Sequence, residues 1–265
     1  MSDVYDCTTP QGLTEGVAAA VVAAQAGRVV VLPTDTLYGV GCDAFCAEAV
    51  SAVLAAKGRG REMPPPVLVP NPRTVDGLAR EVPDYARALI QAHWPGPLTL
   101  VLKAQSSLQW DLGDTNGTVA VRMPDDEIAL AVLCAVGPMA VTSANATGQP
   151  AATTLEQARE QLGEAVAVYL DGGPARGGAA STILDCTGAA PITLRAGALG
   201  QAAIDAVVVR ANQEAALVAA AAAAAQETER EHSRRLLARE QAERDRAADP
   251  RRAKAPKVAG SRKRR

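Results

Sequence analysis

The sequence predicts an α/β domain in which helices flank a twisted, mixed sheet, followed by a C-terminal extension of different character. Helical and strand-like patterns alternate from residue 12 to about residue 200, which is typical of an α/β fold. The chain of 265 residues is 48% hydrophobic, ample for a sizeable core. After Gly200 the alternation stops, and alanines and charged residues take its place. We therefore expect one domain over residues 12–200 and a separate extension.

The elements follow one another with recognisable boundaries. Leu13–Ala26 has a helical pattern and Gly27 closes it, a common residue at helix ends. Thr153 and Glu156 have capping-box spacing at the start of a later helix. The remaining predictions are helices at residues 47–56, 83–92 and 127–136, and strands at residues 28–32, 67–69, 98–102, 119–123, 139–142, 166–170, 181–185 and 192–195.

The most informative of these elements is the strand over residues 28–32. Pro33 should end it, because proline cannot donate to a sheet ladder. Thr34, Asp35, Thr36 and Tyr38 then place hydroxyls and a carboxylate where the chain leaves the sheet. Gly39 and Gly41 follow and permit close approach of the backbone. A polar strand end of this kind is typical of a ligand site in an α/β sheet, although an ordinary loop would have the same composition.

The extension divides by composition into two parts. Residues 201–249 contain a run of seven alanines and then many charges, which predicts an exposed helix. Residues 250–265 lack the apolar side chains needed to fold, so we expect a disordered basic tail. Residues 226–265 carry 14 basic and 7 acidic side chains, against 13 and 22 in residues 1–225. A basic end on an acidic body suits a polyanionic partner such as RNA, and it suits a solubilising role equally well.

Several functional classes are disfavoured by composition. The first ten residues lack the order of a signal peptide, and no long uncharged apolar run predicts a membrane span, so we expect a soluble cytoplasmic protein. The chain has five cysteines without a CxxC pair and two histidines, which argues against a zinc site and for free thiols. No nucleophile, histidine and carboxylate set is evident, and His93 beside Trp94 is expected to be structural.

Cations and polar strand ends indicate instead a protein that holds anions. Lys57, Arg59 and Arg61 share a loop with two glycines, a pattern that suits polyphosphate and also an ordinary surface loop. Arg122 lies within an apolar strand and Arg195 ends another. A buried arginine needs an anion, supplied by a ligand or by an internal salt bridge.

Eight short motifs in series make this assignment specific. Their order resembles that of the YrdC family of threonylcarbamoyl-AMP synthases over residues 12–200. The motifs are PTDTLYG at 33–39, Lys57-x-Arg59, PGPLTL at 95–100, VAVRMP at 119–124, TSAN at 142–145, DGG at 171–173, STILD at 181–185 and LRAG at 194–197.

The resemblance implies a twisted sheet around a large, positively charged cavity. It also implies a reaction that joins L-threonine, bicarbonate and ATP into threonylcarbamoyl-AMP and pyrophosphate, for threonylcarbamoyladenosine synthesis in tRNA. Mg²⁺ would arrive with ATP rather than in a protein cage of its own. The implied partners are the proteins that transfer the threonylcarbamoyl group to tRNA, and possible direct contact with tRNA follows from the basic tail.

The family's functional residues map onto this sequence motif by motif. The implied threonine pocket is Thr34, Thr36, Arg122 and Ser181. The implied ATP side is Lys57, Arg59, Thr118, Ser143, Asn145 and Arg195, with Lys57 and Arg59 as the catalytic pair.

Two departures from the family pattern affect neighbouring contacts. Pro64-Pro65-Pro66 replaces the usual Pro-Leu, which puts contacts by Met63 and Leu68 in doubt. Thr147 and Ala151 stand where the family commonly has serine. Two other functions remain open, a double-stranded RNA-binding module and a carbamoyl-transfer enzyme of the hydrogenase-maturation type.

Overall fold

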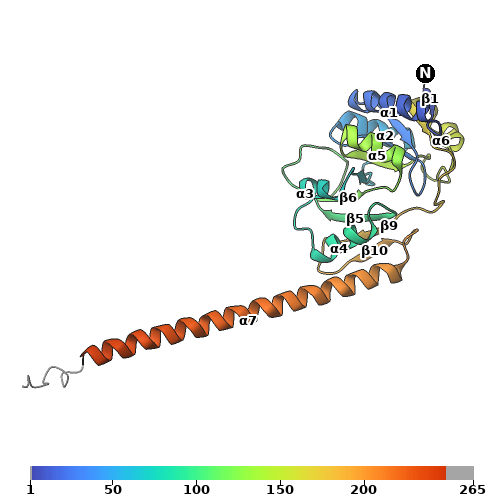
Figure 1. Ribbon diagram of the computed structural model, residues 1–265. Helices are drawn as coiled ribbons and strands as arrows, with labels where there is room; N and C mark the ends of the chain where they lie inside the picture. The colour runs from blue at the N-terminus through green and yellow to red at the C-terminus, as the bar shows by residue number, and fades with distance from the viewer. Residues whose placement is uncertain (1, 249–265) are drawn as a thin grey trace, which may run out of the picture. The chain divides into compact units, whose positions relative to one another are not determined.

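A computed structural model describes residues 2–248, with side chains through residue 246, and divides the chain into two compact units that meet at Asn212 and Gln213. The first unit is the predicted α/β domain (Figure 1). It reaches twelve residues beyond Gly200, the predicted end of the domain. Residues 250–265, predicted to be a disordered tail, lie outside the described part of the chain.

Ten strands of the described chain form one mixed sheet in the order β1-β8-β2-β3-β7-β4-β6-β5-β9-β10. Four neighbouring pairs are parallel (β1 with β8, β2 with β8, β4 with β6, β5 with β9) and the other five are antiparallel. This confirms the predicted fold class. The strands are β1 Asp3–Asp6, β2 Val30–Leu32, β3 Gly39–Asp43, β4 Val67–Leu68, β5 Leu98–Lys103, β6 Thr118–Arg122, β7 Met139–Ser143, β8 Val168–Asp171, β9 Thr182–Asp185 and β10 Ile192–Arg195.

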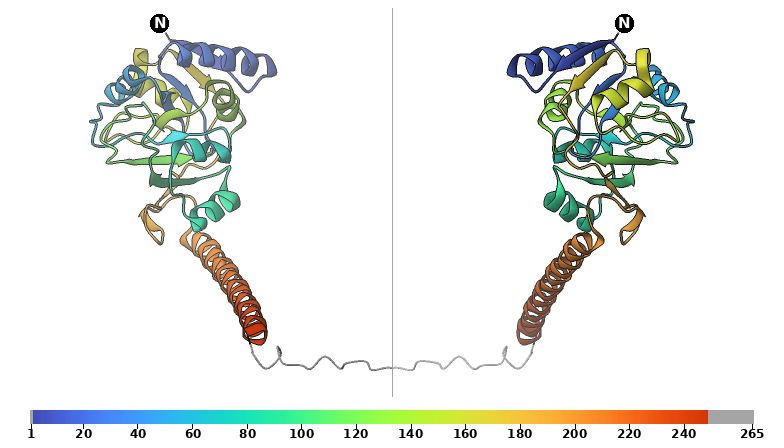
Figure 2. Two further views of the ribbon diagram at one scale, coloured as in Figure 1. Left: turned by 90° about the vertical axis from the view of Figure 1, so that its left-hand side faces the viewer. Right: turned by 90° about the vertical axis from the view of Figure 1, so that its right-hand side faces the viewer.

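Helices cover both faces of this sheet because its strands alternate two apolar faces. Val30 and Leu32 of β2 pack with α1 and α5, whereas Val31 between them packs with α2 on the other face. The side views show α1 in dark blue, beside the N-terminus (Figure 2). The helices are α1 Pro10–Gln25, α2 Ala47–Lys57, α3 Val75–Leu78, α4 Asp84–His93, α5 Glu127–Val136, α6 Leu155–Leu162 and α7 Gln201–Ala248, with short 3-10 turns at Pro72–Thr74 and Gly163–Ala165.

Local signals explain several helix ends. Asp126 caps α5 by accepting hydrogen bonds from the amides of Ile128 and Ala129, both at 3.0 Å. Gly58 ends α2 in the left-handed region, at φ 60°. The cap of α6 is Thr154 rather than Thr153, one residue later than the predicted capping box.

Two strands of the sheet were not predicted. Strand β1 (DVYD) is a mostly exposed edge strand, so its sequence carries little of the apolar pattern that marks a strand. Strand β3 contains Gly39 and Gly41, which the sequence assigned to a loop. A Cβ at Gly41 would lie 2.5 Å from the carbonyl oxygen of Ala140 on β7. At Gly41 the close approach is therefore to the backbone of the neighbouring strand.

Helix α7 begins in the first unit and continues into the second. Ile204, Val207 and Ala211 are 1%, 6% and 9% exposed and belong to the core of the first unit. In the second unit the side chains of Leu217 and Leu237 are largely exposed. By length and composition alone, the helix over residues 201–246 is long and apolar enough to cross a membrane, since its most apolar 18-residue stretch has a mean hydropathy of 1.2. The predicted absence of a membrane span therefore stays a prediction.

Candidate active site

A cavity of about 520 Å³ opens beside the central strands, within the size range of small-molecule sites. It is lined by residues of β3, β4, β5, β6, β7, β9 and β10, of the turn after β2 and of the loop after α2. Among the predicted site residues it exposes Thr34, Thr36, Arg59, Thr118, Arg122, Ser143, Ser181 and Arg195. Lys57 and Asn145 do not line it.

The turn after β2 carries the hydroxyls of Thr34 and Thr36, which differ in their remaining capacity for hydrogen bonds. Thr34 Oγ1 donates to the carbonyl of Leu37 at 2.6 Å and accepts the amides of Thr36 and Leu37, each at 3.2 Å. Its proton and both of its acceptor sites are therefore committed, although the Thr36 hydroxyl lies only 3.0 Å away. Thr34 is consumed in holding the turn, whereas Thr36 keeps acceptor capacity toward the cavity.

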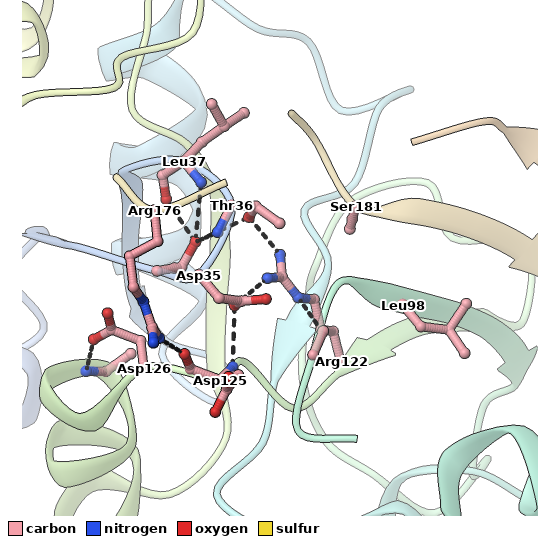
Figure 3. A network of polar contacts seen from close by, with 12 residues as sticks. Asp35, Thr36, Leu37, Leu98, Arg122, Asp125, Asp126, Arg176 and Ser181 are labelled. Carbon is pink, nitrogen blue, oxygen red and sulfur yellow. Dashed lines mark hydrogen bonds and ion pairs between the residues drawn. The ribbon is translucent and has the colours of Figure 1, made fainter. Parts of the chain in front are cut away.

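Arg122, at the end of β6, is 7% exposed and is held at three nitrogens. Its Nε donates to the carbonyl of Gly96 at 3.0 Å and its Nη1 to Thr36 Oγ1 at 2.9 Å. Its Nη2 donates to the Asp35 carboxylate, and the two side chains are 8% and 9% exposed (Figure 3). Burial lowers the pKa of Arg122 and the charge of Asp35 opposes that shift. An internal salt bridge is thus present, and Arg122 still reaches the cavity.

Ser181 contacts residues of two cavity-lining strands, β5 and β10. Its hydroxyl lies 2.8 Å from Thr99 Oγ1, a buried hydroxyl on β5 that also lines the cavity. Arg195 donates through Nε and Nη2 to the main-chain carbonyl of Ser181, at 3.1 and 2.7 Å. The sequence did not single out Thr99, although the motif LTL places it between two core leucines.

Among the three arginines that line the cavity, Arg59 makes the fewest hydrogen bonds. Its Nη1 donates to Thr142 Oγ1 at 3.0 Å, while its buried Nε has no partner within the described chain. Burial lowers the pKa of Arg59. A half-buried guanidinium that lines a cavity and is held by a single hydrogen bond is suited to an anionic ligand.

Lys57 lies behind the wall rather than in it. Its side chain is 3% exposed, and its Nζ donates to the carbonyls of Ser143 and Asn145, both at 2.5 Å, and to Asn145 Oδ1 at 3.3 Å. Burial and the nearby charge of Arg59 lower the pKa of Lys57 to about 8. The Asn145 amide group donates to the carbonyls of Ala146 and Gln149. Both residues therefore hold the loop that presents Ser143, a role the sequence did not distinguish from ligand contact.

The remaining predicted positions are divided between the wall and the surface. Thr118 donates to the Thr115 carbonyl at 2.7 Å and still lines the cavity. Leu68 and Ala151 also line it, whereas Met63 is 42% exposed and does not. The three prolines at residues 64–66 form part of the wall.

Metal and thiol chemistry have little support in the described residues. Between residues 2 and 246 no group of three His, Cys, Asp or Glu side chains is placed to hold a metal ion. The five cysteines are free, as predicted. His93, at the end of α4, does not line the cavity.

Comparison with known proteins agrees with this geometry. The Sua5/YciO/YrdC family model, described as "Telomere recombination", matches residues 22–197. A Mycobacterium leprae protein provisionally named threonylcarbamoyl-AMP synthase is 55% identical over 208 residues, 78% of this chain and 94% of that protein. The Bacillus subtilis threonylcarbamoyl-AMP synthase is 36% identical over 194 residues, 72% of this chain and 56% of that protein.

A solved structure gives the same result. The crystal structure of Pyrococcus abyssi Sua5 complexed with L-threonine matches with a TM-score of 0.70 and 35% identity, over 72% of this chain and 56% of that one. The cavity, its motif residues and these similarities together establish that the chain belongs to the Sua5/YciO/YrdC family.

Proposed function

We propose that this chain is a threonylcarbamoyl-AMP synthase, a nucleotidyltransferase that makes the activated intermediate for threonylcarbamoyladenosine modification of tRNA. The observation that carries the proposal is one cavity lined both by Arg122 with hydroxyls and by Arg59, in a chain whose relatives bear that name. The first group suits an amino acid and the second a polyphosphate.

The amino-acid end takes L-threonine through its carboxylate. Arg122 supplies the cation, and Thr36 and Ser181 supply hydroxyls beside it. Thr34 supports this end by fixing the turn rather than by contact, because its hydroxyl is already saturated. A relative of known structure was crystallised with L-threonine.

The nucleotide end takes ATP. Arg59 lines the cavity with only its Nη1 engaged, at Thr142, and Thr118, Ser143 and Arg195 line the same cavity. Lys57 and Asn145 keep Ser143 in place. Mg²⁺ enters with ATP as part of the substrate, bound to phosphate oxygens and water.

The reaction needs two bond-forming steps. The threonine amine attacks bicarbonate and gives a carbamate with loss of water. A carbamate oxygen then attacks the α-phosphorus of ATP, the bond to the β-phosphate oxygen breaks, and pyrophosphate leaves. Catalysis rests on holding the reactants together and on neutralising the phosphate charge, which Arg59 is placed to do.

The product carries a labile mixed anhydride, so a partner that transfers the threonylcarbamoyl group to tRNA must accept it. We place the protein in the cytoplasm with that machinery. The composition of the basic end suits direct contact with RNA, since residues 249–265 hold eight basic side chains and one acidic one. Residues 226–246 are balanced, with six of each.

The test is release of pyrophosphate from ATP, with L-threonine and bicarbonate omitted in turn. We expect release only when all three are present. Arg59→Ala should lose most of it. Arg61→Ala is the matched control, because Arg61 lies two residues away and binds Asp111 at 2.8 and 3.1 Å instead. Activity independent of threonine would favour the carbamoyl-transfer alternative. Tight binding of double-stranded RNA with no pyrophosphate release would favour an RNA-binding module.

RNA contact by the basic end is tested separately. Full-length protein should bind tRNA more tightly than a chain ending at Ala248, and the difference should shrink steeply with salt as counterion release requires. Equal binding by both chains would assign the basic end a different role.

A further inference from the structure

One buried charge near the cavity has no place in the proposed reaction. Asp35 belongs to the turn after β2, yet only its neighbours Thr34, Thr36 and Leu37 line the cavity. Its carboxylate accepts hydrogen bonds through one oxygen, Oδ1, from Arg122 Nη2 and from the main-chain amide of Asp125 at 3.0 Å. It therefore lies on the far side of the guanidinium from the ligand space.

The charge balance around Arg122 depends on this carboxylate. Asp35 is the anion that favours the charged form of Arg122, whereas Arg195 disfavours it by repulsion. The other two partners of Arg122, the Gly96 carbonyl and the Thr36 hydroxyl, are neutral. A buried ion pair adds little net stability, whereas removing one partner leaves the other charge uncompensated.

Asp35 is itself clamped from three directions. Thr34 Oγ1 organises the turn that carries it. The glycine-rich loop after β8 passes over it, where a Cβ at Gly177 would lie 2.5 Å from the Asp35 carbonyl oxygen and the Gly178 amide donates to Thr36. On the other side, the Asp125 amide ties Asp35 to the segment that follows β6, and Arg176 donates to the carbonyl of Asp125 (Figure 3).

From this arrangement we propose that Asp35 is a positioning residue that sets the guanidinium plane of Arg122 and thereby the affinity for the carboxylate of the amino-acid substrate. The inference rests on the proposed function, which supplies the identity of that substrate. Asp35 does not touch the substrate, and its effect passes through Arg122. The expected signature is a loss of amino-acid affinity with nucleotide affinity preserved, because Arg59 lies on a different loop.

The test compares Asp35→Ala and Asp35→Glu with wild type in the full chain, measuring KM for L-threonine and for ATP and, without turnover, L-threonine binding by calorimetry. Alanine removes both hydrogen bonds, and glutamate keeps the charge but moves it by one methylene. We expect each variant to raise the L-threonine KM and Kd about tenfold to a hundredfold, since a small misplacement of a binding group is costly. The KM for ATP should stay within about twofold.

Two further variants complete the experiment. Asp35→Asn can keep both hydrogen bonds through its carbonyl oxygen, so it should recover much of the lost affinity. Asp125→Ala is the matched control, because it removes an exposed neighbouring carboxylate and leaves the main-chain bond to Asp35 intact. It should behave as wild type.

The outcomes distinguish a failure of the positioning role of Asp35 from a failure of the proposed synthase function. If wild type releases threonine-dependent pyrophosphate and folded Asp35→Glu keeps its L-threonine KM, the positioning role is wrong. An equal rise in both KM values would also overturn it, because that pattern indicates general loosening. If wild type itself shows no threonine-dependent release, the proposed function fails first.

Discussion

The boundary of the folded domain gives a sharp prediction. The domain anticipated from sequence ends near Gly200, whereas Ile204 and Val207 on the first turns of α7 are 1% and 6% exposed within the core. Full burial of such a side chain contributes about 1.5–3 kcal/mol, so losing both should cost about 3–6 kcal/mol. Since domains are stable by only about 5–15 kcal/mol, a chain ending at Gly200 should be close to unfolding. A chain ending at Asn212 keeps both residues and should match full length.

Urea denaturation of the three chains measures this directly. The chain ending at Asn212 should have the midpoint of full-length protein, and the chain ending at Gly200 a markedly lower one or no folded baseline. Ile204→Ala in the full-length chain should cost about 2–5 kcal/mol and links the effect to packing. If the chain ending at Gly200 is as stable as full length, the assignment of the first turns of α7 to the core is wrong.

Three shorter predictions concern the site itself. Arg122→Lys keeps the positive charge but not the planar guanidinium that donates through three nitrogens. The lost interaction should cost about 1.5–3 kcal/mol, which raises the L-threonine KM roughly 10- to 150-fold. An unchanged KM would show that Arg122 does not bind the substrate. Arg59→Ala should raise the ATP KM or lower kcat while L-threonine binding by calorimetry stays unchanged, and intact ATP kinetics would make its loop a surface loop. For Lys57, a folded-state pKa of about 8 lies below the ordinary value of about 10.4, so the folded protein releases this proton first. The stability of wild type relative to Lys57→Met should therefore rise from about pH 8 to about pH 10.4, and parallel stability curves would contradict the lowered pKa.

The sequence predicted the fold class and the location of the site because both depend on local patterns. Strand β2 ends before Pro33, and the polar turn that follows does line the cavity. Arg122 stood out because an arginine in an apolar strand requires a partner. That partner could not be identified from the sequence, since Asp35 and Arg122 are 87 residues apart and meet only in the folded sheet.

Other features were missed for the same physical reason. The sequence suggests that Lys57 is a ligand-binding cation, but its partners include main-chain carbonyls 86 and 88 residues away. Because every residue carries such a carbonyl, the sequence cannot show which of them will accept a hydrogen bond. The sequence suggests that Gly41 lies in a loop, whereas in the structure it lies in a strand where β7 is too close to leave room for a side chain. Ile204 and Val207 resemble the rest of an alanine-rich helix until the core is assembled around them.

The most direct test of the central claim follows the carbon of bicarbonate. The full-length protein is incubated with ATP, Mg²⁺, L-threonine and carbon-13 bicarbonate, and the nucleotide products are analysed at once by mass spectrometry. The account predicts an adenylate that carries both threonine and the labelled carbon, formed together with pyrophosphate and absent when L-threonine is omitted. Production of AMP and pyrophosphate with no labelled, threonine-containing adenylate would contradict it.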